Sequence, residues 1–154
     1  MATRQINAAG LALVKKFESC SLEAYQDEAG VWTNGYGNTV GVDANTPDIT
    51  QEQADADLLN NLADAEKDVN SFCFARMLDI TDNQFSALVS LCFNCGYAPL
   101  SGSLGNALTN KDFNTASECF LLWDKVHING ALTVSQGLLN RRLAEQNLFN
   151  LPVT

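Results

Sequence analysis

The stretch from Glu18 to Thr39 most constrains what this 154-residue chain can fold into. Residues 6–17 carry apolar side chains at spacings of three and four, which predicts an amphipathic helix that ends near Glu18. Residues 24–33 then form two short β-prone pieces around a turn that contains Asp27, which predicts a hairpin. Two carboxylates on different supports can face each other across a cleft, one protonated and one ionised. Cleavage of a glycosidic bond requires such a pair.

Apolar side chains recur at helical spacing through most of the remaining chain. The most apolar segment, 85–95, follows a capping sequence at Thr81 and ends at Gly96, which can adopt the positive φ of a helix C-terminus. Residues 72–78 are expected to form a short apolar linker, with a helical conformation as the alternative, and residues 127–133 a loop. Further helices are expected at 50–69, 100–110, 114–123 and 136–149.

These elements place the chain in the α+β class. We expect a small N-terminal β-hairpin lobe at about residues 19–50 and a larger helical lobe at about 51–154, which also includes the first helix. The cleft between the lobes is the expected ligand site. A chain of 154 residues can bury a sizeable core, so residues 1–154 are expected to form one domain.

The last expected helix carries two adjacent arginines among its apolar residues. Arg141 and Arg142 have two interpretations: one of them approaches Glu18, or both lie on the helix surface as a solvated pair. The residues expected to face inward are Leu138, Leu139, Leu143, Leu148 and Phe149.

Charge and hydropathy exclude several classes of partner. The chain has 18 acidic and 9 basic residues, a net charge of −9, which serves solubility. Nucleic-acid binding requires clustered Lys and Arg, so we expect no nucleic-acid partner. No apolar run reaches the length of a membrane span, and residues 1–7 lack the apolar region of a secretory signal. We therefore expect no stable membrane insertion and no signal peptide.

The five cysteines cannot all pair within one chain. Cys92 and Cys95 form a C-x-x-C pair, but no histidine lies nearby and no second such pair exists. We therefore expect no metal and no cofactor. Both thiols are expected on one helix face as small apolar fillers, with a redox role as the alternative. Reduced thiols are typical of a protein made in a cytosol.

A series of short segments carries motifs in a fixed order: Phe17-Glu18, Ala24–Asp27, Gly30–Thr33, Gly35–Gly37, Gln84–Ser90, Phe93–Gly96, Phe120–Trp123, Gly137-Leu138 and Arg141–Glu145. Together they cover nearly the whole chain and resemble the phage lysozyme family, the endolysins of glycoside hydrolase family 24. The intervals between Glu18, Asp27 and Thr33 match the catalytic acid, aspartate and threonine of that family.

The resemblance implies a muramidase that hydrolyses the β-1,4 bond between N-acetylmuramic acid and N-acetylglucosamine in bacterial peptidoglycan. Glu18 is expected to remain protonated at the end of its helix and to donate a proton to the glycosidic oxygen. Asp27 and Thr33 are expected to position the attacking water, and family precedent favours inversion. The candidate substrate-binding residues, each with a purely structural role as the alternative, are Thr39, Phe93 and Asn94.

The resemblance also implies a partner and a location. Peptidoglycan glycan strands are the expected partner, and the protein is expected to be a monomer. It is expected to remain in the host cytoplasm until a separate pore protein releases it to the cell wall in the periplasm.

Two asparagines depart from the family pattern. Asn38 stands where many relatives carry histidine, and Asn34 stands where they carry an apolar residue, which is expected to loosen the packing beneath the sheet. Two other functions stay open: a catalytically silent murein-binding module, and a lytic transglycosylase, which needs the acid but no water-directing pair. The intact Glu18, Asp27 and Thr33 weigh against both.

Overall fold

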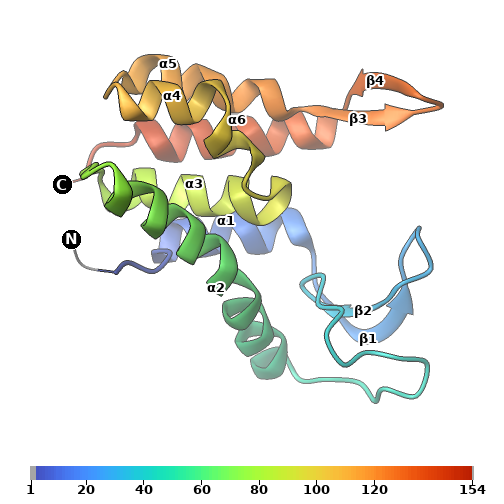
Figure 1. Cartoon of the computed structure of the whole chain (residues 1–154). Coiled ribbons are helices and arrows are strands. Elements are labelled where there is room, and N and C mark those ends of the chain that lie inside the picture. Colours follow the sequence, from blue (N-terminus) through green and yellow to red (C-terminus); the bar gives the residue numbers. More distant parts are fainter. Residues whose placement is uncertain (1–2, 154) are drawn as a thin grey trace. The chain divides into compact units, whose positions relative to one another are not determined.

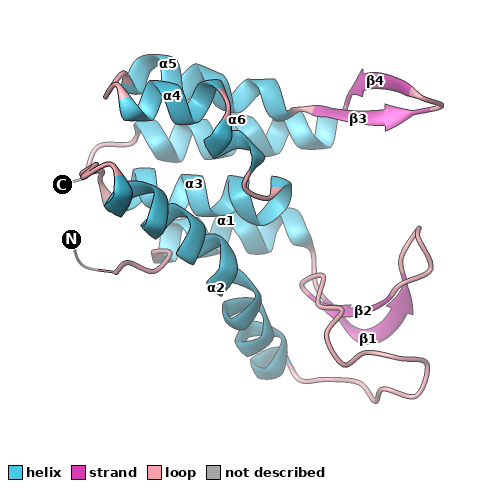
Figure 2. Ribbon diagram, in the orientation of Figure 1, coloured by secondary structure: helices cyan, strands magenta, loops and turns pink. Residues whose placement is uncertain are grey.

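A computed structural model describes residues 3–153 of the chain, and it shows a mixed fold of helices and small antiparallel hairpins (Figures 1 and 2). The predicted α+β class is confirmed. The helices are α1 (Ala8–Glu18), α2 (Gln51–Ala75), α3 (Asp82–Cys95), α4 (Ser103–Thr109), α5 (Phe113–Cys119) and α6 (Gln136–Asn150). The strands are β1 (Ser21–Gln26), β2 (Trp32–Gly35), β3 (Lys125–Ile128) and β4 (Ala131–Val134), and 3₁₀ turns cover Ala98–Ser101 and Phe120–Trp123.

Two compact units divide the chain. One is Val14–Ala63, and the other comprises the described residues before Val14 and after Ala63, so the boundaries fall within α1 and α2. We call the first the hairpin unit, because it contains β1 and β2, and the second the helical unit.

The hairpin unit is built around a single two-stranded antiparallel sheet. Tyr25 pairs with Thr33 and Gln26 with Trp32, while the register shifts between Ser21 and Tyr25. The first half of α2 supplies buried apolar residues to this unit, namely Ala54, Leu58 and Leu62. The predicted hairpin at 24–33 is therefore confirmed.

The start of α2 has a cap on one side only. The hydroxyl oxygen of Thr50 accepts a hydrogen bond from the backbone N–H of Gln53 at 3.1 Å. The Gln53 side chain donates to Asp57 at 2.8 Å, one turn further along the helix. At its C-terminus α2 continues to Ala75, so the helical alternative for the apolar segment 72–78 is confirmed for its first four residues. Apolar residues at Phe72 and Cys73 are buried, which stabilises this last turn.

The helical unit is organised around α3, which packs against α6 (Figure 1). Thr81 and Gln84 form the full capping box at its start, and Gly96 ends it with a φ of 75°. All residues from Phe85 to Cys92 are buried, which places α3 in the core as its apolar sequence predicts.

The C-terminal helix α6 buries charge in place of some expected apolar residues. Leu148 and Phe149 are buried as predicted, but Leu143 is 40% exposed. Arg141, Arg142 and Glu145 are buried instead, at 3%, 0% and 0% exposure. The expectation of an inward Leu143 is therefore wrong, because the face of α6 that contacts α3 carries an ion-pair network.

Residues 125–134 form a second hairpin, so the expected loop at 127–133 is wrong (Figure 2). Asn129 and Gly130 have φ angles of 51° and 80°, which gives a two-residue turn whose twist matches the flanking strands. Asn-Gly is the strongest short sequence signal for such a turn, and it was available in the sequence. Every residue of β3 and β4 is exposed, so buried and exposed positions do not alternate along these two strands.

None of the helices in the described part of the chain has the length and apolar character needed to cross a membrane.

Candidate active site

Glu18 occupies the last position of α1, where the chain leaves the helix. Ser19 has a φ of 59°, a left-handed conformation that ends a helix, and β1 begins two residues later. The Glu18 side chain is half-buried. Its Oε2 lies beside the turn that follows β2, because a methyl group placed on Gly37 would be 3.4 Å from it. The Glu18 carboxyl therefore lies at the end of α1 and next to this turn.

Asp27 lies in the turn between β1 and β2 and is exposed. Its Oδ1 accepts hydrogen bonds from the backbone N–H groups of Ala29 and Val31, each at 2.9 Å. Gly30, with a φ of 80°, donates its N–H to the Asp27 carbonyl at 2.9 Å. Both hydrogen bonds that the described residues donate to the carboxylate go to Oδ1, so the turn fixes this oxygen and directs Oδ2 elsewhere.

Thr33 is on β2 and is 3% exposed. Its hydroxyl donates to the carbonyl oxygen of Val31 at 2.9 Å, and the same carbonyl accepts the backbone N–H of Asp27 at 2.9 Å. The Val31 carbonyl thus accepts a hydrogen bond from each of these two residues. The structure brings Asp27 and Thr33 together at the end of the hairpin. The sequence provides no signal for Val31, because it acts through its backbone.

The other candidate binding residues are divided between the two units. Thr39 is exposed and follows the turn beside Glu18, in the hairpin unit. Phe93 is half-buried and Asn94 exposed, both on α3 in the helical unit. The Asn94 side-chain oxygen accepts hydrogen bonds from Arg142 and, at 3.6 Å, from the Cys95 thiol. Asn94 therefore has a structural partner whatever its role toward substrate.

Arg141 and Arg142 are not a surface pair, so that interpretation is wrong. Glu145 Oε2 lies 3.3 Å from Arg141 Nε, and Glu145 Oε1 lies 3.1 Å from Arg142 Nη1. The Ser90 hydroxyl also donates to Glu145, at 2.5 Å. Burial raises the pKa of Glu145, while Arg142, Ser90 and Arg141 act in the opposite direction. An approach of either arginine to Glu18 stays a prediction.

All five cysteines are free thiols. Burial raises the pKa of Cys92 to about 12, as expected for an apolar filler in the core. Cys95 is half-exposed, and its sulfur accepts a hydrogen bond from Arg142 at 3.3 Å. Its thiol therefore makes a polar contact and does not act as an apolar filler. Among the described residues, no group of three or more His, Cys, Asp or Glu side chains could hold a metal ion.

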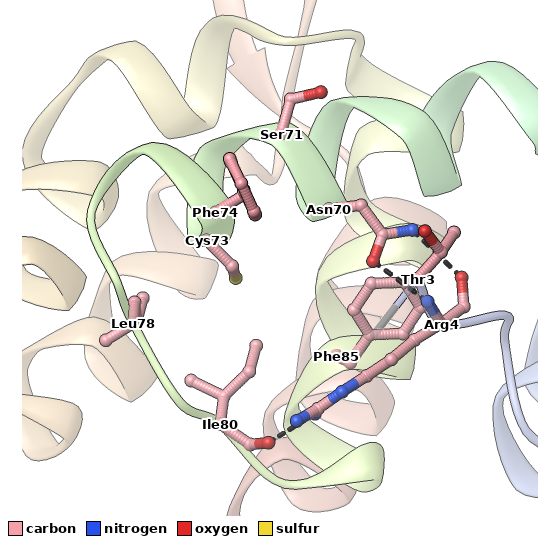
Figure 3. A pocket seen from close by; sticks show the side chains of 9 residues that line it. All are labelled: Thr3, Arg4, Asn70, Ser71, Cys73, Phe74, Leu78, Ile80 and Phe85. Carbon is pink, nitrogen blue, oxygen red and sulfur yellow. Dashed lines mark hydrogen bonds between the residues drawn. The ribbon is translucent and has the colours of Figure 1, made fainter. Parts of the chain in front are cut away.

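A pocket of about 270 Å³ lies in the helical unit, and none of the predicted site residues lines it (Figure 3). The Asn70 side chain exchanges hydrogen bonds with the backbone of Arg4, at 3.0 and 2.9 Å. The Arg4 guanidinium donates to the Ile80 carbonyl and to Asp79. The polar groups in this pocket therefore anchor the N-terminal segment to α2 and to the loop before α3.

The fold and the residues of the hairpin define a class, the lysozyme-like muramidases. The muramidase domain of SpmX from Asticaccaulis excentricus matches with a TM-score of 0.87 and 32% identity, covering 97% of this chain and 99% of that chain. The endolysin from Escherichia coli O157:H7 phage FAHEc1 matches with a TM-score of 0.81 and 33% identity, covering 97% of this chain and 95% of that chain.

Sequence similarity identifies the family within this class. Residues 15–145 match the phage lysozyme family. The endolysin of Acyrthosiphon pisum secondary endosymbiont phage 1 is 39% identical over 145 residues, which cover 94% of this chain and 97% of that protein. The chain belongs to the phage lysozyme family, and the predicted family is confirmed.

Proposed function

We propose that Glu18 is the general acid of a muramidase, and that Asp27 and Thr33 position the water that attacks the sugar. Membership of the phage lysozyme family makes the protein an endolysin, a glycoside hydrolase that acts on peptidoglycan. The bond we assign to it is the β-1,4 link between N-acetylmuramic acid and N-acetylglucosamine.

The hydrogen-bond pattern around Val31 is the observation that supports these roles. Thr33 uses its hydroxyl proton on the Val31 carbonyl, so toward any further partner the hydroxyl oxygen is an acceptor. Asp27 has Oδ1 engaged by two backbone N–H groups, and an ionised carboxylate is also only an acceptor. A water between them therefore donates both of its protons, one to each residue, and its lone pairs remain to attack carbon.

The proposed reaction is a single displacement. A bond forms between the water oxygen and the anomeric carbon of the muramic acid residue while the bond to the glycosidic oxygen breaks. Glu18 gives its proton to the leaving oxygen, and Asp27 takes a proton from the water. The product is a new reducing end with inverted configuration, since water attacks from the face opposite the leaving group.

Product analysis on purified murein fragments tests the reaction class. Mass spectrometry should show fragments that have gained one water, with N-acetylmuramic acid at the new reducing end. Anhydro-muramic ends would instead identify a lytic transglycosylase, and sedimentation with intact sacculi and no product would identify a silent binding module. Either result would overturn the proposed function.

Thr33→Val tests the water-positioning role. Valine keeps the branched shape and the strand preference of threonine but removes the hydroxyl. Hydrolysis should fall by roughly 10²-fold or more, while binding of oligosaccharide stays similar, because the lost interaction acts on the attacking water. The anomer that native enzyme releases first should be α. A β-anomer, or normal turnover by Thr33→Val, would reassign Asp27 as a nucleophile.

The remaining assignments belong to the same proposal. Thr39, Phe93 and Asn94 bind the glycan strand, and the whole chain acts as one catalytic domain, with a hairpin lobe at about 19–50 and a helical lobe formed by the rest. The enzyme works as a monomer. It is held in the host cytoplasm until it is released to the cell wall.

A further inference from the structure

The turn at the end of β2, residues 34–38, is closed by hydrogen bonds between Asn34 and Asn38. The backbones of Asn34 and Asn38 exchange two, at 2.9 and 2.8 Å, around Gly35, Tyr36 and Gly37. The Asn38 amide also donates to the Asn34 side-chain oxygen at 3.1 Å. Asn34 and Asn38 are only 2% and 7% exposed. Asn34 was expected to loosen the packing beneath the sheet, but its buried side-chain oxygen has a hydrogen-bond partner in Asn38.

Asn38 connects this turn to helix α2. Its side-chain oxygen accepts the amide of Asn61 at 3.0 Å and the backbone N–H of Val40 at 3.3 Å. Its amide nitrogen donates to the Val40 carbonyl at 3.3 Å in addition to Asn34. We call Asn34, Asn38 and Asn61 the amide chain. Buried amides are costly to leave unpaired, so each bond in this chain favours a single position of the turn.

The amide chain holds the segment that separates the proposed acid from the proposed water site. Thr33 directly precedes Asn34, and the Glu18 carboxyl oxygen lies beside Gly37. A displacement of the turn would therefore move the backbone next to Glu18 and the end of β2 together.

A second set of contacts ties the tip of the turn to α1. The Tyr36 hydroxyl accepts from Gln51 at 3.0 Å, and Gln51 also donates to Asp55 at 3.0 Å. Lys15, on the helix that ends at Glu18, lies 3.2 Å from Asp55 and 5.7 Å from the centre of the Tyr36 ring. These exposed or half-exposed contacts are worth less individually than the buried amide bonds. They place the same turn against the helix that carries the acid.

We propose that Asn38 and Asn61 are positioning residues for catalysis, which act by holding the turn 34–38 against the Glu18 carboxyl. The inference rests on the proposed function of Glu18. Asn61 is informative because its side-chain amide donates to Asn38. Asn61 itself has no place in the proposed chemistry. A purely structural role would lower the melting temperature and leave turnover of the folded enzyme unchanged.

Asn61→Leu tests the proposal, with Asn60→Leu as its matched control on an exposed position of the same helix. Leucine has a similar size to asparagine and cannot donate to Asn38. Both variants are assayed on a soluble murein oligosaccharide of defined length, well below their melting temperatures. Asn61→Leu should lower kcat by about 10- to 100-fold with KM within about two-fold of native, because a small misplacement of a reacting group is costly. Asn60→Leu should match the native enzyme.

Asn61→Gln provides the rescue, because it keeps an amide donor and Asn61 is only half-buried. It should recover most of the lost kcat. If Asn61→Leu does not fold, Asn61→Ala replaces it, with Asn60→Ala as its control. A native kcat in the folded Asn61 variant, whatever its melting temperature, would overturn the positioning role, as would an equal loss in the Asn60 control.

Glu18→Gln in the same assay separates this inference from the proposed function. An amide cannot donate the required proton, so turnover should be lost. If Glu18→Gln turns over normally, the proposed function fails and the positioning role fails with it. If Glu18→Gln is inactive and Asn61→Leu has a native kcat, only the positioning role fails.

Discussion

At the scale of single residues, Asp27 carries two tasks in one carboxylate. Oδ1 holds the turn between β1 and β2 through two backbone N–H groups, and Oδ2 is assigned to the attacking water. The two tasks can be separated by a substitution that retains one oxygen as an acceptor.

Asp27→Asn should preserve the turn and abolish most of the turnover. The asparagine oxygen can accept from Ala29 and Val31, but the second position becomes an N–H₂ donor that cannot take a proton from water. We expect a melting temperature close to native and a rate lower by about 10²- to 10⁴-fold. Asp27→Ala should lose the turn bonds as well, so a thermal melt distinguishes the two variants. Near-native hydrolysis by Asp27→Asn would remove Asp27 from the reaction.

Cys92 should be inert toward alkylating reagents in the folded protein. Burial raises its pKa to about 12, so at pH 8 only about 10⁻⁴ of the thiol is ionised. Because the folded-state pKa lies above the unfolded value of about 9, this residue's contribution to stability is complete below pH 9 and is lost as the pH rises toward 12. Peptide mapping after brief treatment with iodoacetamide at pH 8 should show labelling of exposed Cys20 and none of Cys92. Equal labelling of the two would contradict this burial.

At the scale of elements, α6 shows how a helix can bury its charged residues. Arg141, Arg142 and Glu145 compensate one another, with Ser90 of α3 as a further donor. A buried ion pair of this kind contributes little net stability when complete, but removing one partner leaves the others uncompensated.

Glu145→Gln should therefore destabilise the protein by about 3–5 kcal/mol in chemical denaturation. Two buried guanidinium groups would lose the Glu145 carboxylate that pairs with both of them. The matched control is Glu118→Gln at an exposed position, which should change the free energy of unfolding by no more than about 0.5 kcal/mol. Similar small effects of both substitutions would show that the network is not energetically coupled.

At the scale of the whole molecule, the net charge of −9 opposes approach to murein, whose stem peptides carry carboxylates. Raising the salt concentration from about 10 mM to about 150 mM shortens the screening length from about 30 Å to about 8 Å. KM for sacculi should therefore fall over this range. A KM for sacculi that rises steadily with salt would indicate attraction through a local basic surface instead.

The sequence alone determined much of this protein. The periodicity of residues 6–17, the turn residues at 27–30 and the capping signals around Thr81 and Gly96 are local, and each predicted its element. The order and spacing of short motifs identified the family. The hairpin at 125–134 was missed although its Asn-Gly turn and the alternation of polar and apolar residues in Lys125–Ile128 were both visible. Only the structure shows that both strands are exposed on all their residues.

Only the tertiary structure decided which polar residues are buried and with which partners. Arg141 and Arg142 look like surface residues by composition, and they are buried because Glu145 and Ser90 offer charge and hydrogen bonds at that position. Asn34, Asn38 and Asn61 are ordinary polar residues in the sequence, yet their amides meet in one chain. Apolar burial follows a repeating pattern along the chain, whereas the pairing of polar groups depends on distances between segments that no local pattern encodes.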